Sequence, residues 1–109
     1  MYKNHILKIT AKTQADGPQT LGNRGFEYLP HHQIQIEVSE QPSAGTIKVE
    51  YLTPGASEYV EAEGSPVDLT ALNKAAAYRL DDVFIESFKF SPALLDAAKT
   101  YNIVIVSNE

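Results

Sequence analysis

The 109-residue sequence contains no cysteine and no tryptophan. The absence of cysteine excludes thiol catalysis, disulfide bonds and cysteine-ligated zinc. No apolar run reaches even ten residues, which excludes a transmembrane helix. Residues 1–10 lack the long apolar segment and the small-residue cleavage pattern of a secretory signal, so we expect none. Internal repeats and low-complexity tracts are also missing, and the length predicts one domain over residues 1–109.

The composition is that of a globular chain, because 43% of the residues are hydrophobic. The formal net charge is −5, and the charge is uneven along the sequence. Residues 37–68 contain seven acidic residues and a single lysine, Lys48, a sum of −6. Because nucleic-acid binding requires clustered cations, this pattern argues against a nucleic-acid partner. The acidic segment is either a solvated strand face or a surface that meets a basic patch on a partner.

Alternation of apolar and polar residues with a period of two dominates the sequence. Residues 32–38 and 46–51 are the clearest examples, and residues 6–12 follow the same pattern. Strands that are apolar on one side only are typical of antiparallel sheets with one solvated face. The inward positions predict a core that includes Ile34, Ile36, Val38, Ile47 and Val49.

Turn residues separate these segments every eight to twelve positions, as in β-sandwiches and barrels. The fold class that follows is all-β: an antiparallel β-sandwich, immunoglobulin-like or jelly-roll-like, with at most one or two short helical turns. About seven strands are expected, at residues 6–12, 32–38, 46–51, 59–61, 67–69, 78–90 and 100–107.

Three segments depart from the strand pattern. Residues 13–31 hold three glycines and two prolines and little apolar content, which predicts a long irregular loop, either mobile or held by contacts beyond its own core. Residues 91–98 predict a short helix, with Ser91 as N-cap and Pro92 at the first helical position. The alanine-rich residues 69–78 predict a loop with a single turn at most.

The sequence contains no catalytic motif. His31 and His32 are adjacent on a predicted strand, so they point to opposite faces and cannot readily hold one metal ion. Asp81 and Asp82 are also adjacent. For the same reason they cannot face each other across a cleft, as glycosidase carboxylates do. No serine lies in a Gly-x-Ser-x-Gly motif. We therefore expect no enzymatic activity, no cofactor and no metal.

The last two long strands are apolar on both faces. Tyr101, Ile103 and Ile105 form one face of the final strand, and Val104 and Val106 form the other. In residues 83–90, Val83 and Ile85 oppose Phe84, Phe88 and Phe90, unless a bulge changes the phase there. A second buried face predicts a contact with another subunit. The predicted interface residues are Val104, Val106, Phe84 and Phe88.

A resemblance is carried by residues 42–107. Residues 42–49 read P-x-A-G-T-(hydrophobic)-x-V, and a short hairpin follows and ends at residues 66–69. A strand ending at residues 88–92 and a closing strand at 99–105 complete the pattern. This arrangement resembles small β-sandwich virion proteins of bacteriophages, such as capsid-decorating, spike and tail-associated subunits. The segment around Tyr101 is also similar to the tyrosine corner of fibronectin-type and immunoglobulin-like sandwiches.

The resemblance implies a structural virion subunit, made in the host cytoplasm, with itself and other virion proteins as partners. Self-association into a homo-oligomer is expected, and a three-fold arrangement would suit such a subunit. The alternative is a carbohydrate-binding or adhesion-type β-sandwich module. Such modules expose aromatic platforms, for which Tyr28, Tyr51, Tyr59 and Tyr78 are the candidates.

Overall fold

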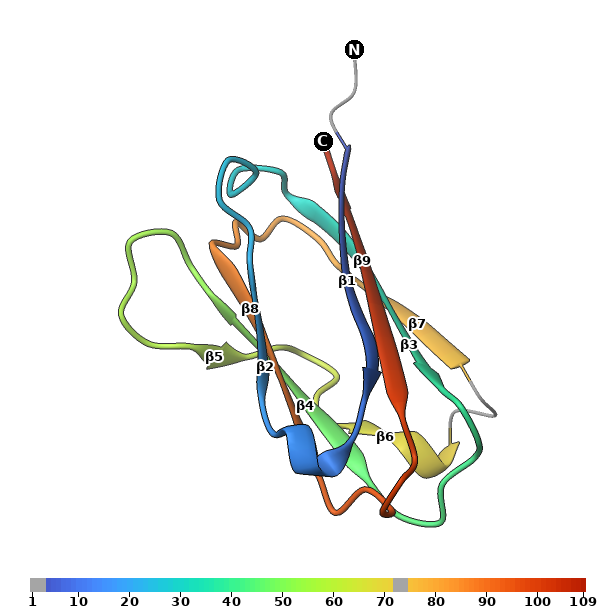
Figure 1. The fold of residues 1–109 in the computed structure, drawn as a ribbon. Helices are drawn as coiled ribbons and strands as arrows, with labels where there is room; N and C mark the ends of the chain where they lie inside the picture. The colour runs from blue at the N-terminus through green and yellow to red at the C-terminus, as the bar shows by residue number, and fades with distance from the viewer. Residues whose placement is uncertain (1–3, 72–74) are drawn as a thin grey trace.

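The computed structural model describes residues 4–71 and 75–109, and these residues form two antiparallel sheets packed as a sandwich (Figure 1). Sheet A has the strand order β1-β9-β3-β7, and sheet B has the order β2-β8-β4-β5, with β6 also paired to β4. The predicted all-β antiparallel sandwich is confirmed. The strands are β1 (Asn4–Lys12), β2 (Gln19–Gly22), β3 (His31–Val38), β4 (Thr46–Leu52), β5 (Val60–Glu61), β6 (Val67–Asp68), β7 (Ala75–Leu80), β8 (Ser87–Ala93) and β9 (Tyr101–Asn108).

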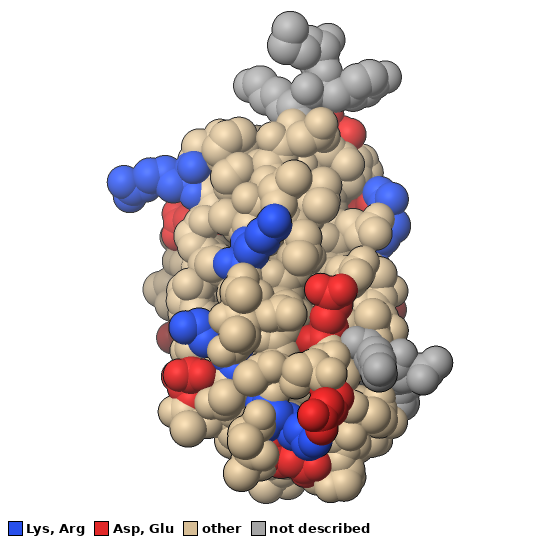
Figure 2. Space-filling view, turned by 45° about the vertical axis from the view of Figure 1, so that its right-hand side comes forward, with Lys and Arg blue, Asp and Glu red and all other residues tan. Residues whose placement is uncertain are grey.

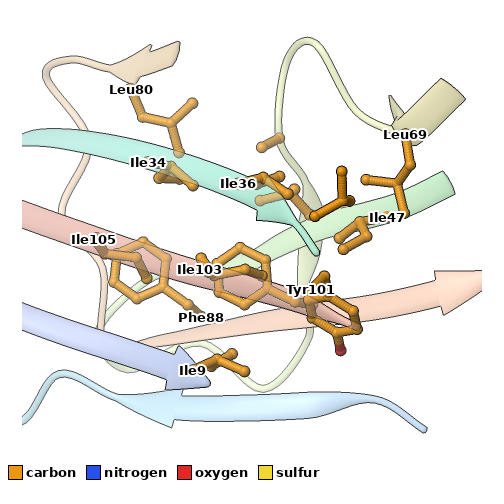
Figure 3. Packing of buried hydrophobic residues seen from close by; sticks show 14 of the residues in the cluster. Ile9, Ile34, Ile36, Ile47, Leu69, Leu80, Phe88, Tyr101, Ile103 and Ile105 are labelled. Carbon is orange, nitrogen blue, oxygen red and sulfur yellow. The ribbon is translucent and has the colours of Figure 1, made fainter. Parts of the chain in front are cut away.

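The core lies between the two sheets, as the alternation predicts. Ile34, Ile36, Ile47 and Val49 are fully buried, and Val38 retains 6% exposure. Figure 3 shows side chains of β3 and β9 from sheet A meeting Phe88 of sheet B in this layer. The inward phases predicted for residues 32–38 and 46–51 are therefore confirmed.

Tyr101 is fully buried in this core, but it does not form the hydrogen bond that defines a tyrosine corner. Its hydroxyl has no hydrogen-bond partner among the described residues. Burial raises the pKa of the Tyr101 phenol to about 12, and nearby Asp16 acts in the same direction. The similarity to a tyrosine corner is therefore limited to the position of the side chain.

Tyr101→Phe is expected to leave the free energy of unfolding unchanged or raise it by up to about 1 kcal/mol, because it removes a buried hydroxyl without a partner. Urea unfolding of the two proteins measures the difference. In a true tyrosine corner the same substitution would break a hydrogen bond, so a loss of more than about 1 kcal/mol would contradict the geometry described here.

The expected long strand over 78–90 is wrong. β7 ends at Leu80 and β8 begins at Ser87, with Asp82 in the left-handed region at φ 59° between them. β7 belongs to sheet A and β8 to sheet B, so the chain must cross between the sheets at this point. Aspartate tolerates the left-handed conformation and supplies the break.

The prediction that residues 13–31 form one irregular loop is also wrong in part. A 3₁₀ turn covers Gln14–Asp16, and β2 pairs with β8. The segment is held by its own chain. The Gln14 side-chain amide donates to the Pro92 carbonyl, and Asn23 Nδ2 donates to the Ile85 carbonyl at 2.9 Å. A four-residue strand with one leucine gives too short an alternation to recognise.

The helix expected over 91–98 is absent. Ser91, Pro92 and Ala93 are the end of β8, where they pair with β4. Leu94 and Ala98 adopt positive φ angles of 59° and 65°, which a helix does not allow. Pairing with a neighbouring strand overrides the local preference for a helix start.

The expectation of a loop over 69–78 holds for Leu69–Ala71, which form a second 3₁₀ turn, but it is wrong for the alanines that follow. Ala75–Leu80 form β7 and pair with β3 without a register shift. Residues 72–74, which this expectation also covered, lie outside the described residues. Alanine has little intrinsic strand preference, so the pairing with β3 decides the outcome.

Candidate interaction surface

The outward side chains of β1, β9, β3 and β7 form one face of the molecule, which we call the sheet A face. Val104 and Val106 lie near its middle, because β9 is flanked by β1 and β3. The register places Ile6 beside Val106 across β1 and β9, and Lys8 beside Val104. On the other side, Gln33 and Gln35 of β3 neighbour the same two valines. The two valines and Ile6 therefore form a connected apolar row, which we call the Val104 row.

The Val104 row faces away from sheet B, toward solvent. Ile6 is 56% exposed, and Val104 and Val106 are half-buried by their neighbours on the sheet. The alternate residues Ile103 and Ile105 are fully buried in the core. The two-sided apolar pattern predicted for the final strand is thus confirmed, with one side in the core and the other on the sheet A face.

The charges on the sheet A face cancel, although the whole chain carries −5. Lys8, Glu37 and Arg79 are its charged strand residues, and Asp81 lies at the end of β7. Asp81 Oδ1 is 2.9 Å from His31 Nδ1 and 3.2 Å from Arg79 Nη2. These two hydrogen bonds hold the pKa of Asp81 below its usual value, and the one from His31 has the larger effect. Figure 2 shows a largely uncharged surface, with single charged side chains spread over its upper part and basic and acidic side chains lying together at its lower end.

The other two predicted interface residues do not join the two valines. Phe84 lies in the crossing between β7 and β8, is 48% exposed, and packs edge-on against Tyr28, with 5.3 Å between ring centroids. Phe88 is fully buried and stacks against Phe90 in the core. The placement of Phe88 in a subunit contact is therefore wrong. Residues 81–86 are not part of a strand and β8 begins at Ser87, so the alternation expected over 83–90 does not connect the two rings: Phe84 is exposed and Phe88 points into the core.

His32 is fully buried in β3, on the same side of the strand as Ile34. Its Nε2 lies 2.9 Å from the Val83 carbonyl oxygen, and its Nδ1 lies 2.7 Å from Ser107 Oγ. Because a carbonyl only accepts, Nε2 carries the proton and the neutral ring accepts from Ser107 at Nδ1. Through these two hydrogen bonds, His32 of β3 joins Val83, in the connection between β7 and β8, to Ser107 of β9. Sequence reasoning missed this role, since the partner is a backbone atom 51 positions away.

His32 makes the stability of the protein depend on pH. Burial, the main cause, lowers the pKa of His32 from 6.5; the neighbouring His31 adds to this, while the Val83 carbonyl and Asp81 oppose it. The unfolded chain then binds a proton near pH 6.5 that the folded protein does not bind, so stability falls as pH drops below about 6.5. The lowered pKa of Asp81 matters only at lower pH, where its carboxylate takes up a proton.

We expect the melting temperature of the wild type to fall between pH 7 and pH 5, and the fall to be reduced in His32→Gln. Thermal unfolding followed by circular dichroism measures both. Since the variant loses a buried pair of hydrogen bonds, an NMR titration of the wild-type imidazole serves as a second measurement. A His32 pKa at or above 6.5 would contradict the prediction.

The described residues show no metal-binding group. Among residues 4–71 and 75–109, no three His, Asp or Glu side chains gather in a way that could hold a metal ion. No helix within these ranges is long and apolar enough to span a membrane.

Comparison with known proteins identifies the class of fold. No family model and no curated protein matches the sequence. The fold is similar to that of the SPBc2 prophage-derived protein YomS, over 100% of this chain and 96% of that chain, with a TM-score of 0.54 and 6% identity. The Yersinia pseudotuberculosis-derived mitogen aligns over 98% of this chain and 85% of its own, with a TM-score of 0.45 and 8% identity. A variant of CBM29-2, a family 29 carbohydrate-binding module, aligns over 98% and 78%, with a TM-score of 0.44 and 16% identity.

The chain thus has the fold of a small antiparallel β-sandwich. Among these structures, the prophage-derived protein YomS matches this chain along nearly the full length of both. At 6% identity the likeness concerns the fold alone. It bears out the sandwich architecture that the resemblance implied, and it leaves function to be argued from the surface.

Proposed function

We propose that this chain is a non-enzymatic structural subunit of a phage virion, made in the host cytoplasm, that self-associates through the sheet A face and packs on other virion proteins. The observation that carries the proposal is the Val104 row. A continuous apolar row on an open sheet face is an aggregation hazard unless another surface covers it. A second copy under closed rotational symmetry is the usual cover. The full-length similarity in fold to a prophage-derived protein supports the virion setting.

The charge of the sheet A face favours a second copy over an unrelated partner. A net charge of −5 makes two copies repel on average, but the positive and negative side chains of this face cancel. Two such faces can approach without like-charge repulsion, and Lys8 and Arg79 of one copy can meet Glu37 and Asp81 of the other.

The size of the face sets the expected strength of association. Four strands spaced about 4.8 Å apart and about eight residues long present a planar area on the order of 500 Å². A standard stable interface buries about 800 Å² per partner. Covering the Val104 row contributes several kcal/mol, at about 25 cal/mol per Å², against a cost of association of similar size. We therefore expect assembly at roughly micromolar concentration, strengthened in the virion by contacts with other subunits.

The double substitution Val104→Lys and Val106→Lys tests the proposal. Both lysines would enter a dry interface, so the oligomer should dissociate while the strand content by circular dichroism is retained. The matched control is Thr20→Lys with Val60→Lys, which adds the same two charges at exposed strand positions of sheet B. The control should keep the mass of the wild type by light scattering.

Two other results would speak against the proposed contact. A double variant that keeps the wild-type mass would place the interface elsewhere. A double variant that unfolds as a monomer would show that the valines stabilise the subunit itself rather than a contact between subunits.

The alternative function, a carbohydrate-binding or adhesion-type module, is supported by a different observation. Tyr28 is 69% exposed and lies against Phe84 at one end of the sandwich. Exposed aromatic rings of this kind can stack on sugar rings. The two rings are inclined by 74°, however, so they do not form one flat platform. Titration with soluble oligosaccharides, comparing the wild type with Tyr28→Ala, separates this function from the first.

A further inference from the structure

A groove runs along β7, at the edge of sheet A opposite β1. It does not include the Val104 row. Its volume is about 550 Å³. One wall is β7 itself, and the other is the turn that contains Glu63, Gly64 and Pro66. Tyr51, Val67, Tyr78 and Val83 provide an apolar and aromatic lining. The hydroxyl of Tyr78 is buried without a hydrogen-bond partner among the described residues.

The wall formed by β7 is the edge of the strand, not one of its faces. Residues 76–81 line the groove without interruption, although successive side chains on a strand point to opposite faces. The feature that such consecutive residues share is their backbone. β7 is also the last strand of sheet A, paired with β3 on one side. The N–H and C=O groups of its free edge therefore border the groove.

The edge of β7 differs from every other sheet edge in the described residues. Natural edge strands are protected from pairing by short length, bulges, prolines or charges. β1 has a register shift after Ile9, with Ala11 at φ 52°, β2 has four residues, and β5 and β6 have two each. β7 has six residues, begins with three alanines, and pairs with β3 without a shift. β1 also pairs without a shift over six residues, Asn4–Ile9, but β7 is the edge strand that borders the groove, so it is the edge best placed to accept another strand.

We infer that this groove binds an extended, lysine- or arginine-containing peptide segment of another protein, which adds to β7 as a fifth strand of sheet A. Main-chain hydrogen bonds to the β7 edge would give affinity, and alternate side chains would enter the groove between Tyr51, Tyr78 and Val83. The groove shares Arg79 and Asp81 with the sheet A face but does not include the Val104 row, and the inference does not rest on the proposed function.

Charge decides between a basic peptide and a second copy of this chain. Glu63, Asp68 and Asp81 lie around the groove, and Arg79, its one basic lining residue, pairs with Asp81. If β7 paired with β7 of a second copy, the same three carboxylates from both copies would be brought together. Like charges placed opposite each other oppose such a contact, whereas lysine or arginine in a peptide complements them.

The test uses the full chain and a set of synthetic eight-residue peptides with lysine at both ends and alanine, valine or isoleucine at alternate inward positions. At least one peptide should bind and slow amide hydrogen exchange in β7 by about tenfold or more. Two matched controls use the best peptide with methylated alternate backbone nitrogens, or with glutamate in place of lysine. The first should not bind, and the second should bind about tenfold more weakly.

A charge reversal in the protein provides the second arm. Glu63→Lys should weaken binding of the lysine peptide by about threefold or more, whereas Glu58→Lys, at an exposed position that does not line the groove, should not. The inference is overturned if no peptide binds at about 1 mM, a concentration that detects even a binding free energy near −4 kcal/mol. It is also overturned if protection appears at β1 or β2 instead, if the methylated peptide binds equally well, or if Glu63→Lys has no effect.

Discussion

Ile36→Ala is expected to lower the free energy of unfolding by about 2–5 kcal/mol, the usual cost of a cavity in a packed core. Ile36 is fully buried in β3, where it pairs with Ile103 of β9 on one side and Ala76 of β7 on the other. Because strands flank it on both sides and sheet B covers it, the surroundings have little room to collapse into the space left behind. Urea denaturation at constant pH and temperature measures the change.

The control for this substitution is Gln35→Ala, the adjacent position on the opposite face of the same strand. Its side chain lies on the sheet A face, so the change should stay within about 0.5 kcal/mol in the monomer. An equal effect of the two substitutions, or a loss below about 0.5 kcal/mol for Ile36→Ala, would mean that the inward phase of β3 is misassigned.

Gly45→Ala is expected to be the most damaging of the glycine substitutions, with a loss of about 2 kcal/mol or more. Gly45 has φ +135°, a conformation in which other residues are strained by about 1–3 kcal/mol. An added Cβ would also lie 2.9 Å from Leu95 Cα, a backbone atom that cannot move aside as a flexible side chain does. The Gly45 carbonyl accepts a hydrogen bond from Leu69 N, so the turn is held on that side as well.

Two further glycines separate the causes of this loss. Gly55 has φ +87° and Gly22 has an ordinary φ, and an added Cβ has nothing within 4 Å at either position. Gly55→Ala should therefore show the conformational strain alone, about 1 kcal/mol, and Gly22→Ala should be nearly neutral. A stability of Gly45→Ala equal to that of Gly55→Ala would contradict the close approach between Gly45 and Leu95.

The strands that could be predicted from the sequence are those that carry a long one-sided alternation. β3 and β4 are the clearest, because polar and apolar residues alternate without interruption over most of their length. β2 and β7 could not be recognised, since four residues with one leucine, or three alanines, acquire strand structure only through pairing with β8 and β3. Ser91 and Pro92 have the residue types of a helix start, and cross-strand pairing to β4 overrides that local preference.

The candidate surface could be predicted in part for the same reason. Val104 and Val106 follow an unbroken alternation, so their outward placement opposite Ile103 and Ile105 was readable. Phe84 lies in the connection before β8 and Phe88 lies within β8, and residue types alone do not show that the strand begins only at Ser87. The partnership of Ile6 with Val106 depends on β1 pairing with β9, a contact between the two ends of the chain that local patterns do not encode.

The oligomeric state of the wild-type protein tests the central claim most directly. Sedimentation or light scattering over a concentration series from about 1 to 100 μM, in about 0.15 M salt, gives the mass as a function of concentration. Self-association through the sheet A face predicts a mass that rises to a fixed multiple of 12.0 kDa within this range. A mass of 12.0 kDa at every concentration would contradict self-association through this face.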